Sequence, residues 1–249
     1  VVGSINVDLV TRVPRIPAPG ETLLGSDLVT TYGGKGANQA VMSARLGSHV
    51  YMVGRIGTDS FGTDVLANFE REQVDTTYCL KSNRPTGVAL ISVAESSGQN
   101  TIVVASGANA AVSPADVRAA QPAIDAAGAV MCQLEIPTVA TLEAFRLARA
   151  KPAPAITIFN PAPAVAFPSE LLALCDVIIP NEYEAAQIAA MPPIESPDDA
   201  IAVAKALQAR GVKNVVITLG SQGALLIDTA GESVYVPAEK VEAVDTVGA

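Results

Sequence analysis

The chain has 249 residues, of which 49% are hydrophobic and 16% charged, and its formal net charge is −9. This length holds one large α/β domain, alone or with a small appendage, and the apolar fraction excludes disorder by composition. The negative charge argues against a nucleic-acid-binding protein, because such a protein needs a basic surface. No apolar run reaches the length of a membrane span and no signal peptide opens the chain, so we expect no membrane partner.

The side chains that most often build metal centres and catalytic triads are scarce. Cys79, Cys132 and Cys175 are widely spaced and form no zinc-binding pattern, which favours reduced, buried thiols and a cytoplasmic location. His49 is the only histidine. A histidine-based triad or a histidine-ligated metal is therefore not expected.

The first third of the chain reads as strands and two helices. A buried strand ends at Gly3, and residues 4–8 are expected to leave it as a polar loop. Strands are predicted over residues 9–13, 21–31 and 50–53, and a helix from the turn at 57–62 to about residue 72. Residues 87–94 and 100–105 are rich in β-branched side chains and predict a hairpin.

A glycine-rich stretch, Tyr32-Gly33-Gly34-Lys35-Gly36-Ala37-Asn38-Gln39-Ala40, lies before the third of these strands. Glycines permit sharp turns and close approach of the backbone to a ligand. The pattern then becomes helical, with Gly47 as the predicted C-cap, so the loop leads into a helix N-terminus that favours oxygen-rich or anionic ligands. Neither the P-loop spacing nor the dinucleotide fingerprint is present.

Strands and helices alternate after residue 109. Strands are predicted at 129–133, 155–159, 177–179 and 214–219. Helices are predicted at 138–150 and at 198–210, together with a short helix that ends at 174 and another that begins at about 182. A hairpin is predicted at 225–228 and 233–236. This alternation predicts a mainly parallel sheet with helices on both faces.

Polar residues follow nearly every predicted strand, where ligands of open parallel sheets bind. They are Asn6 and Asp8, the glycine loop, Gln133 and Glu135, Asn160, Asn181 and Glu184, Thr218, Gly220 and Ser221, and Asp245. Asn6 and Asp8, two apart, point the same way on an extended backbone. By contrast, Asp59 is expected to be a turn or cap residue.

Ten stretches along the whole chain resemble ribokinases, within the PfkB family of carbohydrate kinases. They are residues 3–8, 19–22, 33–40, 86–89, 107–109, 133–135, 160–164, 180–182, 218–220 and 244–249. The Gly-Gly-Lys-Gly-Ala-Asn-Gln form and the Gln-Leu-Glu element are similar to ribokinases in particular.

The resemblance implies a three-layer α/β sandwich with a mainly parallel central sheet and a small β-sheet lid. The lid would comprise residues 9–32 and 85–106, and the α/β domain residues 1–8, 33–84 and 107–249. It also implies a homodimer formed through the lid.

The resemblance further implies the ligands: D-ribose, ATP, Mg²⁺ and K⁺. Matching positions assign the sugar to Asn6, Asp8, Gly34, Lys35, Asn38 and Glu135, and the nucleotide to Asn181, Glu184, Thr218, Gly220 and Ser221. Carboxylates and amides suit the sugar, because each can bridge adjacent hydroxyls. Glu184 would reach Mg²⁺ through a metal-bound water, since Mg²⁺ keeps several waters.

The last residues match the start of an anion hole and a monovalent-cation site. Gly248 and Ala249 would offer backbone N–H groups to the transferring phosphoryl group. Asp245 and the carbonyl of Val247 would hold K⁺, which tunes the hole electrostatically. In the family a Gly-Asp pair follows, and its aspartate is the general base, which we expect beyond Ala249 along with much of the adenine pocket.

The implied activity is transfer of the γ-phosphoryl group of ATP to the 5-hydroxyl of D-ribose. The alternatives are another kinase of the family, acting on a nucleoside, fructose or a deoxysugar, and a sugar-binding relative without catalysis. The residue two past Ala249 discriminates between them, because an aspartate there supports catalysis.

Overall fold

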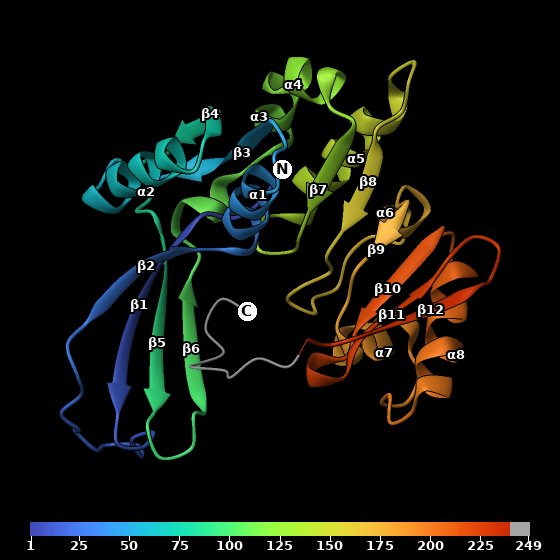
Figure 1. Ribbon diagram of the computed structural model, residues 1–249. Helices are drawn as coiled ribbons and strands as arrows, with labels where there is room; N and C mark the ends of the chain where they lie inside the picture. Colours follow the sequence, from blue (N-terminus) through green and yellow to red (C-terminus); the bar gives the residue numbers. More distant parts are fainter. Residues whose placement is uncertain (240–249) are drawn as a thin grey trace. The chain divides into compact units, whose positions relative to one another are not determined.

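The computed structural model describes residues 1–239 (Figure 1). The chain divides into two compact units. Among the described residues, one unit is Gly3–Val112, and the other is Val1–Val2 together with residues 113–239.

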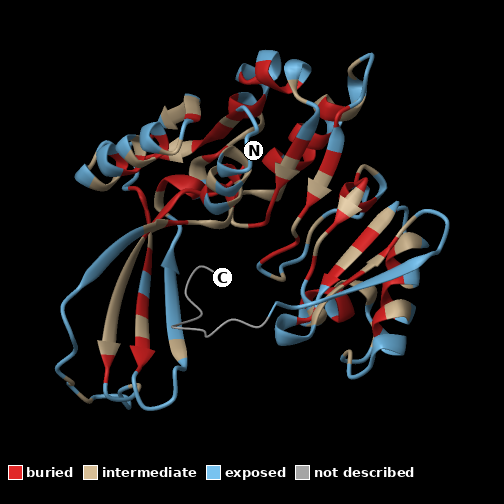
Figure 2. Ribbon diagram, viewed as in Figure 1, coloured by how far each residue is buried: buried red, intermediate tan, exposed pale blue. Residues whose placement is uncertain are grey.

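A four-stranded sheet occupies much of the Gly3–Val112 unit. Its order is β2 (Val29–Gly33), β1 (Asn6–Val13), β5 (Gly87–Ala94) and β6 (Asn100–Ala105). β1 and β5 are parallel, and the other two pairs are antiparallel, so the predicted hairpin of β5 and β6 is confirmed. Alternate residues of β5 form a buried row, which Figure 2 shows as bands along the strand.

Two predictions in this sheet are wrong. The predicted loop over residues 4–8 is wrong from Asn6 onward, because β1 begins there and the pairing of Asn6 with Gly87 starts the ladder to β5. The strand predicted over 21–31 is confined to Val29–Gly33, because β2 pairs only with the first five residues of β1, Asn6–Val10.

The same unit contains a parallel pair, β3 (Val50–Ile56) and β4 (Val74–Lys81), against which α1 (Lys35–Arg45) and α2 (Ser60–Arg71) pack. β4 was not predicted, because most of its residues are only partly buried and its sequence lacks a long apolar run. Gly47 follows the end of α1 with φ +90°, as expected for a terminating glycine.

The second unit is built on a six-stranded sheet. Its order is β12 (Ser233–Pro237), β11 (Gly223–Ile227), β10 (Asn214–Thr218), β9 (Val177–Ile178), β8 (Ile156–Phe159) and β7 (Ala129–Cys132). The four strands β7 to β10 are parallel, and β11 and β12 add an antiparallel hairpin, as the sequence predicted.

The helices of this unit include α5 (Thr138–Ala150), α6 (Glu170–Ala173), α7 (Glu182–Ala189) and α8 (Pro197–Gln208), all expected from the sequence. α3 (Pro114–Ala119) and α4 (Gln121–Ala126) were not predicted, because six residues are too few for a clear helical period. Edge-to-face contacts of Phe159 with Phe145 and Phe167, with ring centroids 5.9 and 5.3 Å apart, fill the core.

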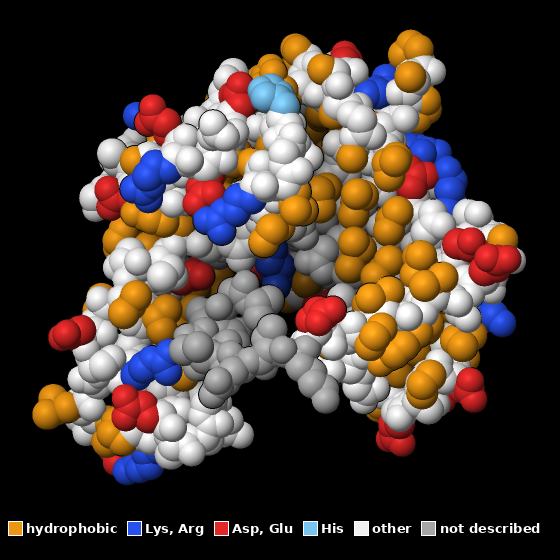
Figure 3. All heavy atoms as spheres, viewed as in Figure 1, with side chains coloured by type: hydrophobic (Ala, Val, Ile, Leu, Met, Phe, Trp, Pro, Cys, Tyr) orange, Lys and Arg blue, Asp and Glu red, His pale blue; other side chains and the backbone are white. Residues whose placement is uncertain are grey.

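The surface shows no sorting of charge on the face drawn in Figure 3, where basic and acidic side chains of the described residues lie interspersed. Hydrophobic side chains gather over β12, where Val234, Tyr235 and Val236 are each about half exposed. Within residues 1–239, none of the helices has the length and apolar character needed to span a bilayer.

Candidate active site

The glycine loop between β2 and α1 sits directly on the segment that leads into β1. Gly34, with φ +90°, is the N-cap of α1, and a Cβ there would lie 2.8 Å from the backbone nitrogen of Asn6. A Cβ on Gly36 would lie 2.6 Å from the nitrogen of Ser4. Ser4 also accepts hydrogen bonds from Gly36 N (to Oγ, 3.2 Å) and Ala37 N (to its carbonyl, 2.9 Å). These positions therefore require glycine.

This contact brings five of the predicted sugar residues into one cluster. The carboxylate of Asp8 lies against Gly33, where an added Cβ would come within 2.1 Å of Oδ2. Asn6 lies beside Gly34, and Lys35 is the first residue of α1. Asn38 follows Lys35 by three residues and so lies on the same side of the helix.

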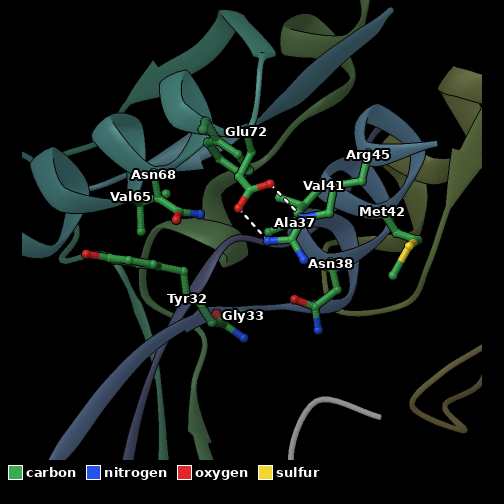
Figure 4. Close-up of a pocket in the computed structure, with 12 residues that line it drawn as sticks. Tyr32, Gly33, Ala37, Asn38, Val41, Met42, Arg45, Val65, Asn68 and Glu72 are labelled. Carbon is green, nitrogen blue, oxygen red and sulfur yellow. Dashed lines mark hydrogen bonds and ion pairs between the residues drawn. The ribbon is translucent and has the colours of Figure 1, made fainter. Parts of the chain in front are cut away.

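A cavity of about 260 Å³ adjoins this cluster, and its walls include Asn6 and Asn38 from the cluster and the neighbouring Gly33. Its other walls come from α1, α2 and the end of β2. Figure 4 shows the side chain of Tyr32 on one side, and the paired side chains of Arg45 and Glu72 between the two helices. Arg45 Nε donates to Glu72 Oε2 at 2.7 Å. Two residues of the cluster, Asn6 and Asn38, thus line a cavity with mixed polar and apolar walls.

Asn109 was not among the site residues predicted from the sequence. It is 1% exposed, and its side chain is hydrogen-bonded to Ile5 and Asn6 at the start of β1. Its Oδ1 accepts from Ile5 N at 2.8 Å, and its Nδ2 donates to Ile5 O at 2.9 Å and to Asn6 Oδ1 at 2.7 Å. The Gly107-Ala108-Asn109 stretch was noted in the sequence, but no periodicity or spacing connects residue 109 with residue 6.

Asp59 is a structural residue, as predicted. It is the N-cap of α2, where its Oδ1 accepts from Gly62 N at 2.9 Å, and its carboxylate also accepts from the backbone and hydroxyl of Thr86. Burial raises the pKa of Asp59, but the hydrogen bonds from Thr86 and Gly62 outweigh burial and hold the pKa below its ordinary value. The ionised carboxylate fixes Thr86 at the start of β5.

The predicted nucleotide residues lie in the second unit, at the carboxyl ends of β9 and β10. Asn181 is the N-cap of α7 and forms a β-bridge with Thr218. Glu184 is buried and joins Asn181 in a capping box. Gly220, with φ +54°, begins the 3₁₀ turn Gly220–Gln222, which contains Ser221. These residues are close in the fold, and their contact with a nucleotide stays a prediction.

Glu135, the remaining predicted sugar residue, follows β7 in this second unit and is partly buried. Its participation in sugar binding stays a prediction. The predicted anion-hole residues Gly248 and Ala249 and the predicted cation ligands Asp245 and Val247 lie outside the described residues.

Across residues 1–239, no three or more His, Cys, Asp or Glu side chains are grouped so that they could hold a metal ion. A single carboxylate such as Glu184, acting through a water, remains compatible with Mg²⁺, which takes few protein ligands in nucleotide sites.

Comparison with known proteins identifies the family. The sequence profile described as pfkB family carbohydrate kinase matches residues 1–249. The chain is 40% identical to a ribokinase of Staphylococcus aureus (strain COL) over 251 residues, which cover 100% of this chain and 81% of that protein. It is 36% identical to a deoxyribokinase of Salmonella typhi, with 100% and 80% covered.

The fold agrees with the sequence. The structure of Arabidopsis thaliana ribokinase complexed with ribose and ATP superposes with a TM-score of 0.84 at 31% identity, covering 95% of this chain and 76% of that one. The predicted ribokinase-like α/β fold is confirmed. The chain belongs to the pfkB family of carbohydrate kinases.

Proposed function

We propose that this chain transfers the γ-phosphoryl group of ATP to the 5-hydroxyl of D-ribose, giving D-ribose 5-phosphate and ADP. The observation that carries the proposal is the packing of the glycine loop on β1, which gathers Asn6, Asp8, Gly34, Lys35 and Asn38 in one cluster. The 40% identity to a ribokinase over the whole chain supports ribose as the acceptor.

Each side chain of the cluster has a role in the proposal. The Asp8 carboxylate accepts hydrogen bonds from sugar hydroxyls, and the amides of Asn6 and Asn38 can donate or accept. The ammonium group of Lys35 donates to a hydroxyl oxygen at the N-terminus of α1. Glu135 contributes a second carboxylate. Together these groups hold the sugar in a fixed orientation, which is the main requirement for in-line transfer.

The proposed nucleotide half uses Asn181, Glu184, Thr218, Gly220 and Ser221. Mg²⁺, when bound, would supply positive charge that neutralises the phosphates. Glu184 would orient a water of that ion, while Gly248 and Ala249 would donate backbone N–H groups to the transferring phosphoryl group. Asp245 and the Val247 carbonyl would hold K⁺ beside these N–H groups.

The four-stranded sheet would serve as lid and as dimer contact, with residues 9–32 and 85–106 as its extent. Leu90 and Val103, opposite each other in the β5–β6 ladder, are 53% and 65% exposed, and an interface would cover them. Light scattering should then give twice the monomer mass. A cytoplasmic location stays a prediction.

The test is ADP release by the intact protein with ATP and Mg²⁺, using D-ribose, 2-deoxy-D-ribose, fructose and adenosine, in K⁺ and in Na⁺ buffer. The proposal predicts preferred turnover of D-ribose and stimulation by K⁺. Binding of D-ribose without turnover of any acceptor would favour a sugar-binding protein without catalysis.

A second candidate acceptor is 2-deoxy-D-ribose. The 36% identity to a deoxyribokinase, over the same full length, favours it specifically. Higher turnover of 2-deoxy-D-ribose than of D-ribose in the same assay would select this candidate and leave the family and the transfer chemistry unchanged.

A further inference from the structure

We propose that Asn109 is a positioning residue that fixes the side-chain amide of Asn6, so that Asn6 offers its NH₂ group, a hydrogen-bond donor, to the sugar. The proposal rests on the proposed role of Asn6 in sugar binding. Asn109 belongs to the 3₁₀ turn Gly107–Ala111 and is 103 residues away from Asn6 in sequence.

The orientation of the Asn109 amide is fixed by backbone groups. The N–H of Ile5 can only donate, and it donates to Asn109 Oδ1 at 2.8 Å. The carbonyl of Ile5 can only accept, and it accepts from Asn109 Nδ2 at 2.9 Å. Exchanging the oxygen and nitrogen of Asn109 would break both bonds, so the orientation does not depend on a choice between two equivalent amide positions.

This orientation dictates that of Asn6. The second hydrogen of Asn109 Nδ2 points to Asn6, whose nearest atom at 2.7 Å must therefore be the acceptor, Oδ1. Because Asn6 Oδ1 faces Asn109, Nδ2 on the other side of the same amide faces away from Asn109, and it is the group that we assign to the sugar. Asn6 is 3% exposed and lines the cavity beside the glycine loop.

Gly87 supports the same arrangement from the neighbouring strand. A Cβ at this position would lie 2.3 Å from Asn6 Oδ1 and 2.3 Å from Asn109 Nδ2. The pairing of Gly87 with Asn6 in the β1–β5 ladder allows the two amides to meet only because residue 87 has no side chain. Thr86, which Asp59 holds in place, precedes it.

The fixed Asn6 amide gives the site one hydrogen-bond donor beside one acceptor, the Asp8 carboxylate. Asn6 and Asp8 lie two residues apart on β1 and so on the same face of the strand. Asn6 then donates to one hydroxyl oxygen, while the Asp8 carboxylate accepts from a neighbouring hydroxyl. A pair of adjacent hydroxyls matches this donor and acceptor. Without Asn109, the Asn6 amide could turn and place a second acceptor beside the carboxylate.

A double-mutant cycle tests the proposal in the intact protein. D-ribose binding is measured by titration calorimetry without nucleotide for the wild type, Asn109→Ala, Asn6→Ala and the double variant, and KM for ATP is measured for each variant that turns over. We expect Asn109→Ala to raise the Kd for D-ribose about tenfold or more, because the Asn6 amide is no longer oriented and its hydrogen bond to the sugar is lost. KM for ATP should not change.

The decisive result is the effect of Asn109→Ala when Asn6 is already alanine. If Asn109 acts through Asn6, the second substitution no longer changes the Kd for D-ribose. An equal loss in both backgrounds, or no loss in the wild-type background, would overturn the proposal.

Asn109→Asp provides a second, isosteric cycle if Asn109→Ala does not fold. The aspartate still accepts from Ile5 N–H, but it can donate neither to the Ile5 carbonyl nor to Asn6, and it turns the Asn6 amide around. It should therefore also weaken D-ribose binding only when Asn6 is present. A loss of the same size without Asn6 would contradict the proposal.

Failure of the proposed role of Asn109 can be distinguished from failure of the proposed function. If the wild type phosphorylates another sugar instead of D-ribose, the proposed substrate fails, and the same cycle with that sugar still decides the role of Asn109. If the wild type binds no sugar in the panel, both proposals fail together.

Discussion

Asn181 and Glu184 bond to each other in both directions at the start of α7. The Asn181 side chain accepts from the backbone N–H of Glu184 at 2.8 Å, and Glu184 Oε2 accepts from the backbone N–H of Asn181 at 2.9 Å. This capping box satisfies two N–H groups that the helix leaves unpaired. The pair therefore stabilises α7 independently of any nucleotide, and a test of its catalytic role must leave the cap intact.

Glu184→Gln makes this separation. A glutamine oxygen can still accept from Asn181 N–H, so thermal stability should change little, whereas the charge proposed to act on Mg²⁺-bound water is lost. We expect kcat/KM for ATP to fall about ten- to a hundredfold, as for other residues that act through a metal-bound group. KM for D-ribose should stay near the wild-type value.

Asp116→Asn is the matched control for Glu184→Gln. Asp116 forms a capping box with Ser113 at the start of α3, which carries none of the predicted nucleotide residues. The control should leave kcat/KM for ATP unchanged. An equal loss in both variants would mean that the effect at Glu184 comes from the helix cap.

Gly33→Ala should reproduce the effect of removing the Asp8 charge. A Cβ at residue 33 would lie 2.1 Å from Asp8 Oδ2 and must displace the carboxylate. Asp8→Asn loses hydrogen bonds to a charged group worth about 1.5–3 kcal/mol, so KM for D-ribose should rise about ten- to a hundredfold. Steady-state kinetics of both variants measure this.

Gly128→Ala is the control for the glycine substitution, because a Cβ there meets nothing within 4 Å. It should leave KM for D-ribose unchanged. If Gly33→Ala binds D-ribose as tightly as the wild type, Asp8 is not held in its sugar-binding position by Gly33.

Asp176 should contribute to the free energy of unfolding without affecting the binding of D-ribose or ATP. It precedes β9, at the opposite strand end from Asn181, and binds Arg149 Nη1 at 2.8 Å and Lys213 Nζ at 2.6 Å. Burial raises its pKa, but hydrogen bonds from Lys213 and the Thr157 backbone and the attraction of Arg149 outweigh burial, so the pKa lies below its ordinary value.

The sign of the pH dependence follows from that lowered pKa. The stabilisation by Asp176 is complete above the unfolded pKa of about 3.9 and is lost as the pH falls through the lower folded pKa. Asp176→Asn should cost about 2–4 kcal/mol of unfolding free energy at pH 7, because it leaves two cations with a neutral partner. Urea unfolding at pH 7 and pH 3 measures both effects.

Glu170→Gln, which breaks the exposed pair with Arg146, is the comparison for Asp176→Asn. Its effect should be much smaller, since exposed ion pairs contribute little. Equal effects of the two substitutions would contradict the account of Asp176.

The buried thiols should be unreactive in the folded protein. Burial raises the pKa of Cys132 and of Cys175 to about 12, and the thiolate is the reactive form. A thiol reagent at pH 8 should label these two residues slowly in the native state and rapidly in urea, with mass spectrometry locating the label. Rapid native labelling of Cys132 would show that the core around β7 opens readily.

The sequence predicted those parts of the fold whose pattern is local. The parallel strands of the second unit coincide with apolar runs in the sequence. α5 was predicted at its observed bounds because its apolar residues recur with the helical period. β4 and the true extent of β1 and β2 could not be predicted in this way. Most residues of β1 and β4 are only partly buried and those at the start of β2 are exposed, so no apolar pattern marks these strands. The pairing of Asn6 with Gly33 and Gly87 decides where β1 and β2 run.

The same distinction holds for the candidate site. Asn6, Asp8 and the glycine loop were found because they follow predicted strands and match family motifs. Asn109 was not found, because its role depends on three hydrogen bonds to residues more than 100 positions away. Such a contact has no signature in one sequence.

The most direct test of the proposed function is a competition between acceptors. The intact protein is given equal concentrations of D-ribose and 2-deoxy-D-ribose with Mg²⁺, K⁺ and limiting ATP, and the products are identified by mass spectrometry and ³¹P NMR. The product ratio equals the ratio of kcat/KM values for the two sugars. We predict D-ribose 5-phosphate as the main product. A majority of 2-deoxy-D-ribose phosphate, or phosphate on a hydroxyl other than the 5-hydroxyl, would contradict the proposal.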